Sequence, residues 1–321
     1  MAQLNFGRIG VLMGGPSSER EISLKSGTAV LDALKGEGLD ALRVEITTDE
    51  PAQNKALLQS SRIDCAFVAL HGYFGEDGRI QEILDALRIP YTGSGARANR
   101  LAMDKAVSHE RFQAAGLHVP GWLVVEQSKP LPRDAVFEKF GLPLVVKPVT
   151  NGSSIGLSIV ENAKDFDGAL REAFKFDSRA LVEAYIEGKE LTVGILDEQA
   201  LPVVQIVPKN KFFDYEAKYK AGMSEYLVPA PLPGTIAREV QAAGLLAHRT
   251  LGCYGFSRVD VMLDARDNPV VLELNSIPGF TPLSLLPKAA RVAGIEFPSL
   301  CVRLLELALQ RQALLCHAQK P

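Results

Sequence analysis

Short apolar runs alternate with amphipathic segments over the first hundred residues of the chain. The apolar runs predict strands at 8–13, 41–46 and 65–70. Helical spacing of apolar residues begins near Ser18 and again after Gly78. This order is typical of β–α–β units, in which helices cover both faces of a parallel sheet and ligand loops follow the carboxyl ends of the strands. Two polar loops, GGPSSERE at 14–21 and HGYFGEDG at 71–78, follow such strands.

The remaining two thirds of the chain have an α+β pattern. Helices are predicted over 97–116, from near Ala163, over 236–251 and over 297–308. Strands are predicted at 121–125, 144–149, 157–161, 190–196, 203–207, 255–263 and 269–274. We therefore expect a mixed α/β and α+β fold with a doubly wound parallel-sheet domain at 1–95, a central unit at 96–184 and a C-terminal unit at 185–321. The tail after Arg311 is expected to fray.

Composition narrows the class of ligand. The chain of 321 residues is 47% apolar and 23% charged, as in ordinary globular proteins, and its formal net charge is −3. Nearly matched acids and bases do not favour nucleic acid or an anionic membrane as a partner, so small ligands are expected. The four cysteines lack metal-ligand spacing and are expected to be reduced and mostly buried. Neither a signal-peptide pattern nor a membrane-spanning run is found, which favours the cytoplasm.

Two adjacent strand patterns, FSRVDVML and PVVLELNS, carry the most informative polar residues: Arg258, Asp260, Glu273 and Asn275. Strand alternation places these four on one face and Val259, Val261, Leu272 and Leu274 on the opposite, apolar face. A hairpin through 264–268 would bring three oxygen ligands and a guanidinium together. Such a set is typical of a magnesium-nucleotide site. A solvated hairpin face is the alternative.

A second pattern points to phosphate. Lys147 ends the apolar strand LVVKP, and the loop GSSIG follows at 152–156. Backbone N–H groups, hydroxyls and a lysine can together hold a phosphate, although the chain has no P-loop sequence. The segment GSGARA at 93–98 matches a dinucleotide-binding turn, but its strand is short and no acid follows at the expected distance, so a domain hinge is favoured. The loop FFDYEAKYKAG at 212–222 has the composition of a lid.

Eight segments taken in order resemble the D-alanine:D-alanine ligases of the ATP-grasp superfamily: GGPSSERE, HGYFGEDG, MDK, VKPVTNGSSIG, EAYIEGKELTVGIL, DYEAKY, GFSRVDVMLD and LELNSIPGFTPLSLLP. The resemblance covers about residues 8–309. It implies an ATP-grasp fold that holds ATP between two α+β domains, with the first domain supplying part of the substrate site. It also implies ATP-dependent ligation of two D-alanine molecules through a D-alanyl phosphate, for peptidoglycan precursor synthesis.

The resemblance implies roles for residues near the nucleotide. Asp260, Glu273 and Asn275 would hold two Mg²⁺ or Mn²⁺ ions. The ATP-binding set would be Lys105, Lys147, Ser154, Glu183, Ile186, Glu190 and Lys218. Within this set the two lysines Lys105 and Lys147 would contact phosphates, and Glu183 and Glu190 would meet adenine and ribose.

On the substrate side, Glu19 would meet the ammonium of the first D-alanine and His71 its carboxylate. Ser18 and Glu21 also read as a capping box that would hold Glu19 at a helix start. The catalytic set would be Glu19, Ser153, Tyr219, Arg258 and Gly279. Arg258 and the Gly279 N–H would hold the oxyanion, and Tyr219 would bond to Ser153 and through it to Glu19. Ser284 and Leu285 would bind the second carboxylate.

The chain departs from the family pattern at Asn151, where an acid or other polar residue is common, and at Ala184, where a lysine is common. Adenine is commonly held there by backbone groups, so Ala184 is expected to change affinity only. A D-alanine:D-lactate ligase and a non-catalytic nucleotide-binding regulator are the alternatives. The lid segment DYEAKY lacks the histidine that is frequent in D-lactate ligases, which favours D-alanine. A homodimer is expected from the family.

Overall fold

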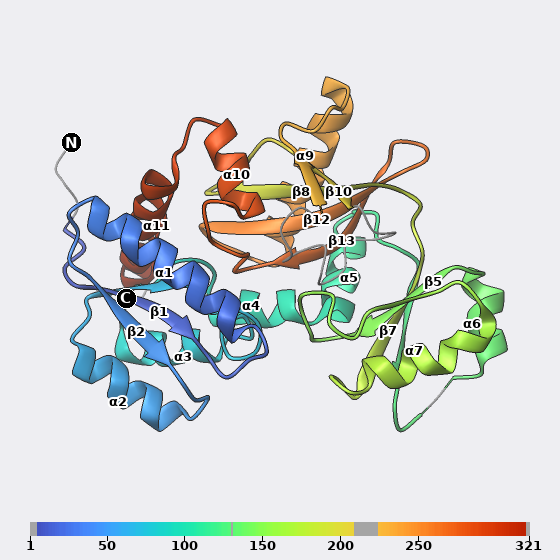
Figure 1. Ribbon diagram of the computed structural model, residues 1–321, viewed down its shortest axis with the longest axis horizontal. Coiled ribbons are helices and arrows are strands. Elements are labelled where there is room, and N and C mark those ends of the chain that lie inside the picture. Colours follow the sequence, from blue (N-terminus) through green and yellow to red (C-terminus); the bar gives the residue numbers. More distant parts are fainter. Residues whose placement is uncertain (1–4, 130, 209–223, 319–321) are drawn as a thin grey trace.

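The computed structural model describes residues 5–129, 131–208 and 224–318. Three separate β-sheets organise these residues, and each sheet falls within one of the three units predicted from the sequence. Figure 1 shows the first sheet and its helices at one end of the molecule, the sheet that contains β5 and β7 at the other end, and the C-terminal sheet between them.

The N-terminal unit is a parallel sheet with helices on both faces. Its strands are β1 (Ile9–Gly14), β2 (Ala41–Ile46) and β3 (Cys65–Val68), in the order β2-β1-β3. Its helices are α1 (Arg20–Gly36), α2 (Pro51–Ser61) and α3 (Arg79–Leu87). Every residue of β1 and β3 is buried, as expected for strands between two helical layers. Helix α2 was not predicted from the sequence, because it buries only Asn54 and Leu58 and has little apolar periodicity.

The single helix predicted over 97–116 is wrong, because Asp104 interrupts it. The chain forms α4 (Ala96–Met103) and α5 (Lys105–Ala114), and Asp104 between them is extended. The Asp104 carboxylate accepts a hydrogen bond from the Val107 N–H at 3.0 Å and so caps α5. This break places Lys105 at the start of α5, where its side chain faces the candidate site.

The central unit is an antiparallel sheet with helices on one face. Its elements are β4 (Trp122–Glu126), α6 (Arg133–Phe140), β5 (Leu144–Pro148), β6 (Ser158–Val160), a 3₁₀ turn (Ala163–Asp165), α7 (Phe166–Ala173) and β7 (Arg179–Ala184). The strand order is β4-β7-β5-β6. Val146 and Val182 pack under α6 and α7, so alternation turns Lys147 and Glu183 to the other face.

The C-terminal sheet has the order β11-β10-β8-β12-β13, with β9 paired to β8. Its elements are β8 (Gly188–Leu196), β9 (Gln199–Ala200), β10 (Val204–Pro208), β11 (Ser224–Leu227), α9 (Gly234–Thr250), β12 (Phe256–Asp264) and β13 (Pro269–Asn275). The predicted β12–β13 hairpin is confirmed. Helix α9 covers the apolar face, where Val240 and Ala247 meet Val193 and Val259.

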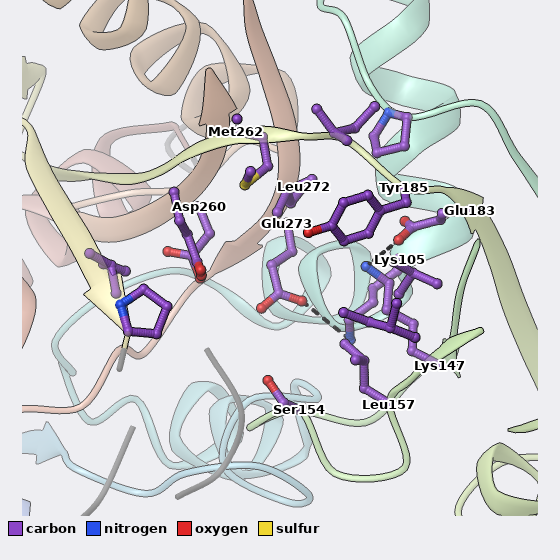
Figure 2. Close-up of a pocket in the computed structure, with 18 of the residues that line it drawn as sticks. Lys105, Lys147, Ser154, Leu157, Glu183, Tyr185, Asp260, Met262, Leu272 and Glu273 are labelled. Atoms are coloured by element: carbon purple, nitrogen blue, oxygen red, sulfur yellow. Dashed lines mark ion pairs between the residues drawn. The ribbon is translucent and has the colours of Figure 1, made fainter. Parts of the chain in front are cut away.

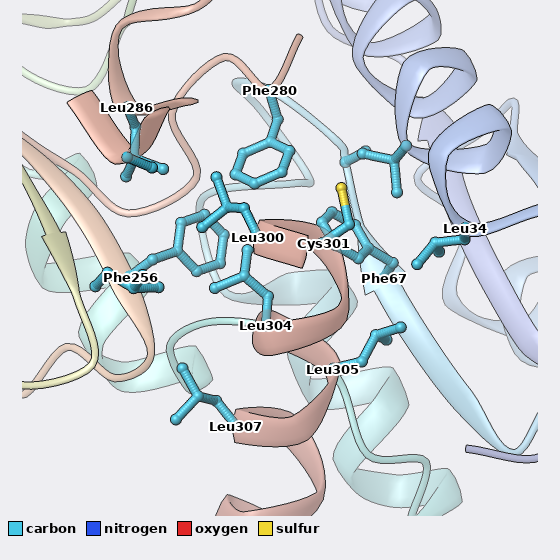
Figure 3. Packing of buried hydrophobic residues seen from close by; sticks show 14 of the residues in the cluster. Leu34, Phe67, Phe256, Phe280, Leu286, Leu300, Cys301, Leu304, Leu305 and Leu307 are labelled. Carbon is cyan, nitrogen blue, oxygen red and sulfur yellow. The ribbon is translucent and has the colours of Figure 1, made fainter. Parts of the chain in front are cut away.

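Two C-terminal helices, α10 (Leu285–Val292) and α11 (Phe297–Ala318), join this sheet to the N-terminal unit. Figure 3 shows one apolar core in which Leu300 and Leu304 of α11 lie among Phe67 of β3, Phe256 of β12 and Phe280. The first and last units therefore share a core, which fixes the two walls of any site between them. In the tail after Arg311, where fraying was predicted, the chain is helical to Ala318, and 319–321 lie outside the described residues.

The segment 93–98 packs tightly between these units. Gly93 has a φ of +86°, and a Cβ atom there would lie 3.1 Å from the ring of Phe256. The thiols of Cys65, Cys253 and Cys301 are buried and free, as predicted, while the side chain of Cys316 is outside the described set. Among the described helices, none combines the length and apolar character needed to cross a membrane.

Candidate active site

Two cavities meet on the polar face of the β12–β13 hairpin. The first, here called the inter-sheet cleft, has a volume of about 350 Å³ and lies between the central and C-terminal sheets (Figure 2). The second, here called the adjoining cavity, has a volume of about 580 Å³ and lies between the N-terminal loops, the hairpin and α10. Asp260 and Glu273 line the cleft, whereas Arg258 and Asn275 line the cavity. The hairpin is thus a shared wall.

Cross-strand register brings the four predicted hairpin residues together. Arg258 stands opposite Asn275, and Asp260 opposite Glu273. The Arg258 guanidinium donates to both Asp260 oxygens, at 2.9 and 2.8 Å, and the Asn275 amide donates to Asp260 Oδ2 at 3.1 Å. The Thr192 hydroxyl on β8 donates to Asp260 Oδ1 at 2.7 Å. Asp260 is consequently held in one orientation by charge-assisted bonds.

The prediction that Leu272 faces the apolar side is wrong. A β-bulge shifts the register between Asp260 and Val261, so that Glu273 pairs with Asp260 and Val271 with Val261. Leu272 is the extra residue on β13, and its side chain lines the inter-sheet cleft beside Met262 (Figure 2). A bulge redirects side chains in this way because it adds one residue to one strand. Sequence alternation alone could not locate it.

The hairpin donors fit a magnesium ion. Asp260, Glu273 and Asn275 supply two carboxylates and one amide oxygen, which are hard ligands. Within the described parts of the chain, no group of three or more His, Cys, Asp or Glu residues could hold a metal ion. Magnesium does not need a complete protein cage, because it commonly keeps water and phosphate oxygens beside one or two carboxylates. The set therefore suits a metal that arrives with a nucleotide.

Two lysines project into the cleft beside these acids. Lys147 on β5 is buried, and its Nζ lies 2.8 Å from Glu183 Oε2 on β7 (Figure 2). Burial opposes the charge of Lys147, but Glu183 and Glu273 outweigh it and raise the pKa of the ammonium. Lys105 Nζ lies 3.8 Å from Glu273 Oε2 and donates to the Asn151 carbonyl at 2.5 Å. The raised pKa favours the charged form of Lys147, which phosphate binding requires.

Glu183 is a buried acid in the lining of the cleft. It is 2% exposed, and His109 Nε2 lies 3.6 Å from its Oε1. Among the residues that the structure describes, that oxygen has no hydrogen-bond partner. A buried acceptor of this kind suits a donor on a bound ring, such as an amino group. Apolar residues flank it and leave a slot for a flat base: Val145, Leu157, Ile159, Ile186, Met262 and Leu272.

The GSSIG loop carries backbone conformations that are rare for residues with side chains. Ser153 and Ser154 have φ values of 55° and 56°. Left-handed non-glycine residues cost of the order of 1–3 kcal/mol and cluster at ligand clamps. Ser154 lines the cleft and Ser153 the adjoining cavity, so the loop spans both. The Ser153 hydroxyl donates to Glu19, which is one part of the predicted Tyr219–Ser153–Glu19 network.

Glu19 lines the adjoining cavity and lies close to two glycines, Gly72 and Gly152. It is only 7% exposed, and a Cβ atom on Gly72 would lie 2.5 Å from its Oε2. Gly72 also has a φ of +67°, so glycine is required there by both space and conformation. The predicted capping box is wrong: Glu19 itself is the residue at the helix N-cap, and α1 has no side-chain cap. Ser17 instead accepts the Glu19 N–H at 3.2 Å.

His71 is buried in the same cavity. Its Nε2 lies 2.9 Å from Ser26 Oγ, and its Nδ1 lies 3.1 Å from the Ile277 carbonyl oxygen and 3.5 Å from Glu76 Oε1. Burial would lower the pKa of His71, but Glu76 and, less strongly, Glu19 overcome this and raise the pKa. The raised pKa favours the charged imidazole, and His71 and Glu19, which line the same cavity, form a pair suited to an amino acid's carboxylate and ammonium.

The far wall of the adjoining cavity is the start of α10. Ser284 is the N-cap residue, and its hydroxyl accepts the Thr281 N–H at 3.0 Å. Gly279, Ser284 and Leu285 all line the cavity with Arg258. A helix start presents free N–H groups and the positive end of the helix dipole, so it favours an anion.

The structure brings together every predicted site residue that it describes. Lys105, Lys147, Ser154, Glu183, Ile186, Glu190, Asp260 and Glu273 line the cleft, and Glu19, His71, Ser153, Arg258, Asn275, Gly279, Ser284 and Leu285 line the cavity. Lys218 and Tyr219 lie outside the described residues. Sequence reasoning missed Thr192, which bonds to Asp260, Glu76, which lies beside His71, and Lys288, which lines the adjoining cavity. Glu76 lies in the loop HGYFGEDG, so the signal was present; Thr192 needed the β8–β12 register.

Comparisons with known proteins agree with this site. Two family models match the chain: the D-ala D-ala ligase N-terminus over 48–94 and the D-ala D-ala ligase C-terminus over 112–306. The D-alanine:D-alanine ligase of Geotalea uraniireducens is 48% identical over 95% of this chain and 97% of that protein. That of Geobacter sulfurreducens is 47% identical over 94% of each chain.

Solved structures give the same result. A D-alanine:D-alanine ligase from Bacillus anthracis complexed with ATP superposes with a TM-score of 0.84 and 33% identity, covering 96% of this chain and 99% of that one. Another structure from that organism has a TM-score of 0.86 and 36% identity over the same shares. The chain thus has an ATP-grasp fold and belongs to the D-alanine:D-alanine ligase family.

Proposed function

We propose that this protein is an ATP-dependent ligase that joins two D-alanine molecules through a D-alanyl phosphate and releases ADP and phosphate. One observation carries the proposal: the cleft, lined by Lys105, Lys147, Asp260 and Glu273, and the adjoining cavity, lined by Arg258 and Asn275, have the β12–β13 hairpin as a common wall. A phosphate donor in the first space and a carboxylate in the second would therefore meet at the hairpin. The product suits peptidoglycan precursor synthesis, the role expected from the family.

The first step activates a carboxylate, which by itself is a poor acyl donor. Glu19 would bind the ammonium of the first D-alanine, and His71 would hold its carboxylate. Lys105 and Lys147 would bind ATP phosphates, while Glu183 and Glu190 would bind the nucleoside. Asp260, Glu273 and Asn275 would hold Mg²⁺ or Mn²⁺, which would supply neutralisation of the phosphate charge. The carboxylate oxygen gains the γ-phosphoryl group and ADP is the leaving group.

The second step forms the peptide bond. The neutral amine of the second D-alanine attacks the acyl carbon, the new C–N bond forms, and the C–O bond to phosphate breaks. Arg258 and the Gly279 N–H would stabilise the tetrahedral oxyanion. The amine loses one proton, and phosphate leaves. Ser284 and Leu285 would hold the second carboxylate.

The two alternatives gain no specific support. A D-lactate ligase is expected to place a cationic histidine beside the second substrate, yet within the described lining of the adjoining cavity His71 is the sole histidine, and Ser26 and Ile277 hold it on the first-substrate side. A non-catalytic regulator would not need Arg258 and Lys147 beside the intact metal-ligand set of Asp260, Glu273 and Asn275.

Phosphate release with ATP, magnesium and D-alanine tests the proposal, with the product identified by mass spectrometry. We expect D-alanyl-D-alanine, and equal D-alanine and D-lactate at pH 7 should still give mainly the dipeptide. Mainly depsipeptide would favour the lactate ligase, and no turnover would favour the regulator. Homodimer formation and a cytoplasmic location remain predictions; size-exclusion chromatography with light scattering tests the first.

A further inference from the structure

Lys288 on α10 lies at the wall of the adjoining cavity, together with Ser284, Leu285 and Arg258. It follows Ser284 by four residues, so the two share a face of the helix. Helical side chains point back toward the N-terminus, which directs the Lys288 stem toward the start of α10. The ammonium therefore belongs to the part of the cavity assigned to the second substrate.

An aromatic ring holds Lys288 in this place. Its Nζ lies 4.1 Å from the centroid of Tyr226 on β11. A cation–π contact orients an ammonium without neutralising it. Within the described residues, no carboxylate lies at ion-pair distance from Lys288. Burial, and to a lesser extent Arg291, lower the pKa of Lys288, as expected for a partly buried cation.

The neighbouring backbone leaves room for an anion beside this cation. The Lys288 N–H bonds to the Ser284 carbonyl at 2.9 Å, and Pro287 has no N–H. The donors left at the start of α10 are those of Leu285 and Leu286. Two N–H groups, a hydroxyl and an ammonium together match the two oxygens of a carboxylate.

Resting on the proposed function, we propose that Lys288 binds the carboxylate of the second D-alanine and sets the orientation of that substrate. Lys288 and Arg258 both repel the substrate's ammonium. The carboxylate therefore turns toward α10 and the amine toward the acyl phosphate. The same repulsion favours loss of the amine proton, which nucleophilic attack requires. The site then selects acceptors that carry a free carboxylate.

A competition between two acceptors tests this role. The enzyme receives ATP, magnesium, and equal concentrations of D-alanine and D-alaninamide, which lacks the carboxylate charge. Mass spectrometry gives the ratio of D-alanyl-D-alanine to D-alanyl-D-alaninamide. We expect the wild type to make mainly the dipeptide, and Lys288→Met to lower the ratio by about tenfold, the effect of losing one charge-assisted bond. Lys288→Arg should restore most of it.

Lys25→Met is the matched control, because Lys25 also lines this cavity, from α1, but is exposed. Its ratio should equal that of the wild type. Damage to the fold lowers both products and leaves the ratio intact, so the ratio isolates recognition of the carboxylate. An unchanged ratio in Lys288→Met, or an equal fall in Lys25→Met, overturns the proposal. A wild type that makes neither product contradicts the proposed function, and the role of Lys288 falls with it.

Discussion

The inter-sheet cleft and the adjoining cavity share a wall but are built differently. Strands supply most of the cleft, where Lys147, Glu183, Asp260 and Glu273 come from four strands of two sheets. Loops and helix starts supply most of the cavity: Glu19, His71 and Ser284 come from three such segments. Strand register fixes the first group locally, whereas packing between distant units fixes the second. Changes in the cleft should therefore act on chemistry, and changes in the cavity on substrate recognition.

The largest effect should come from the shared wall. Glu273→Gln keeps the size of the side chain and removes the charge that faces the cleft. Turnover should fall by about 10²–10³, the cost of losing one electrostatic stabiliser. Steady-state assays at saturating magnesium measure this. Glu225 is an exposed acid on β11 of the same sheet, so Glu225→Gln serves as the control and should leave turnover unchanged. Near-normal turnover in Glu273→Gln would remove Glu273 from the metal site.

A second change should act on the cavity alone. Gly72→Ala introduces a Cβ atom 2.5 Å from Glu19 Oε2 at a φ of +67°. We expect the KM of the first D-alanine to rise by about 10- to 100-fold, because displacing Glu19 loses a charged contact to the ammonium. The KM of ATP should stay within about twofold, since the cleft is untouched.

Gly38→Ala is the control for Gly72→Ala, because it introduces backbone strain without a contact to Glu19. Gly38 has a φ of +75°, but a Cβ atom there would meet nothing within 4 Å. In both variants an alanine in the left-handed conformation should lower the free energy of unfolding by about 1–2 kcal/mol, which denaturant unfolding measures. Only Gly72→Ala should also alter D-alanine binding. If both variants raise the KM of D-alanine equally, Gly72 has no particular role beside Glu19.

A third prediction concerns the loop that lines both the inter-sheet cleft and the adjoining cavity. The segment 152–156 holds two left-handed serines, Ser153 and Ser154, and should close over the triphosphate. Amide exchange there should slow when ATP and magnesium bind, because closure removes open states. Peptides from β1, which is wholly buried, give the reference. Exchange that is the same with and without nucleotide would contradict a clamp.

The same contrast explains what the sequence could predict. Alternation along β12 and β13 placed Asp260 and Glu273 correctly, because both strands lie against an apolar layer and have one polar face. It failed at Leu272, since a bulge depends on the pairing of two strands and leaves no mark in either alone.

Prediction in the cavity needed more than periodicity. Glu19 and His71 were assigned by family resemblance. The capping box expected at Ser18 and Glu21 did not form because α1 begins at Arg20, with Glu19 as the N-cap residue. Lys288 was not singled out in the sequence. Its proposed role depends on Tyr226, which is far away in sequence. Contacts between distant units decide such positions, and a pattern of local spacing does not contain them.

The smallest expected effect is a change in pH dependence from Glu76→Gln. Glu76 outweighs burial and raises the pKa of His71. The charged imidazole thus stabilises the fold below its ordinary pKa, and this contribution is lost as pH rises through the raised value. Without the Glu76 charge, burial dominates, so the pKa of His71 should fall.

Histidine resonances followed by NMR from pH 4 to 9 measure this directly. His248 is the internal reference, because burial lowers its pKa to about 4 and its partner Ser257 is unchanged by the variant. If charged His71 holds the first carboxylate, the alkaline fall in kcat/KM for D-alanine should move to lower pH in Glu76→Gln, while the KM of ATP stays constant. The mutation would then alter D-alanine recognition in the adjoining cavity and leave ATP binding in the inter-sheet cleft unchanged. A His71 titration that is the same in both proteins would show that Glu76 does not control its charge, and the cavity would owe its affinity for the first carboxylate to other donors.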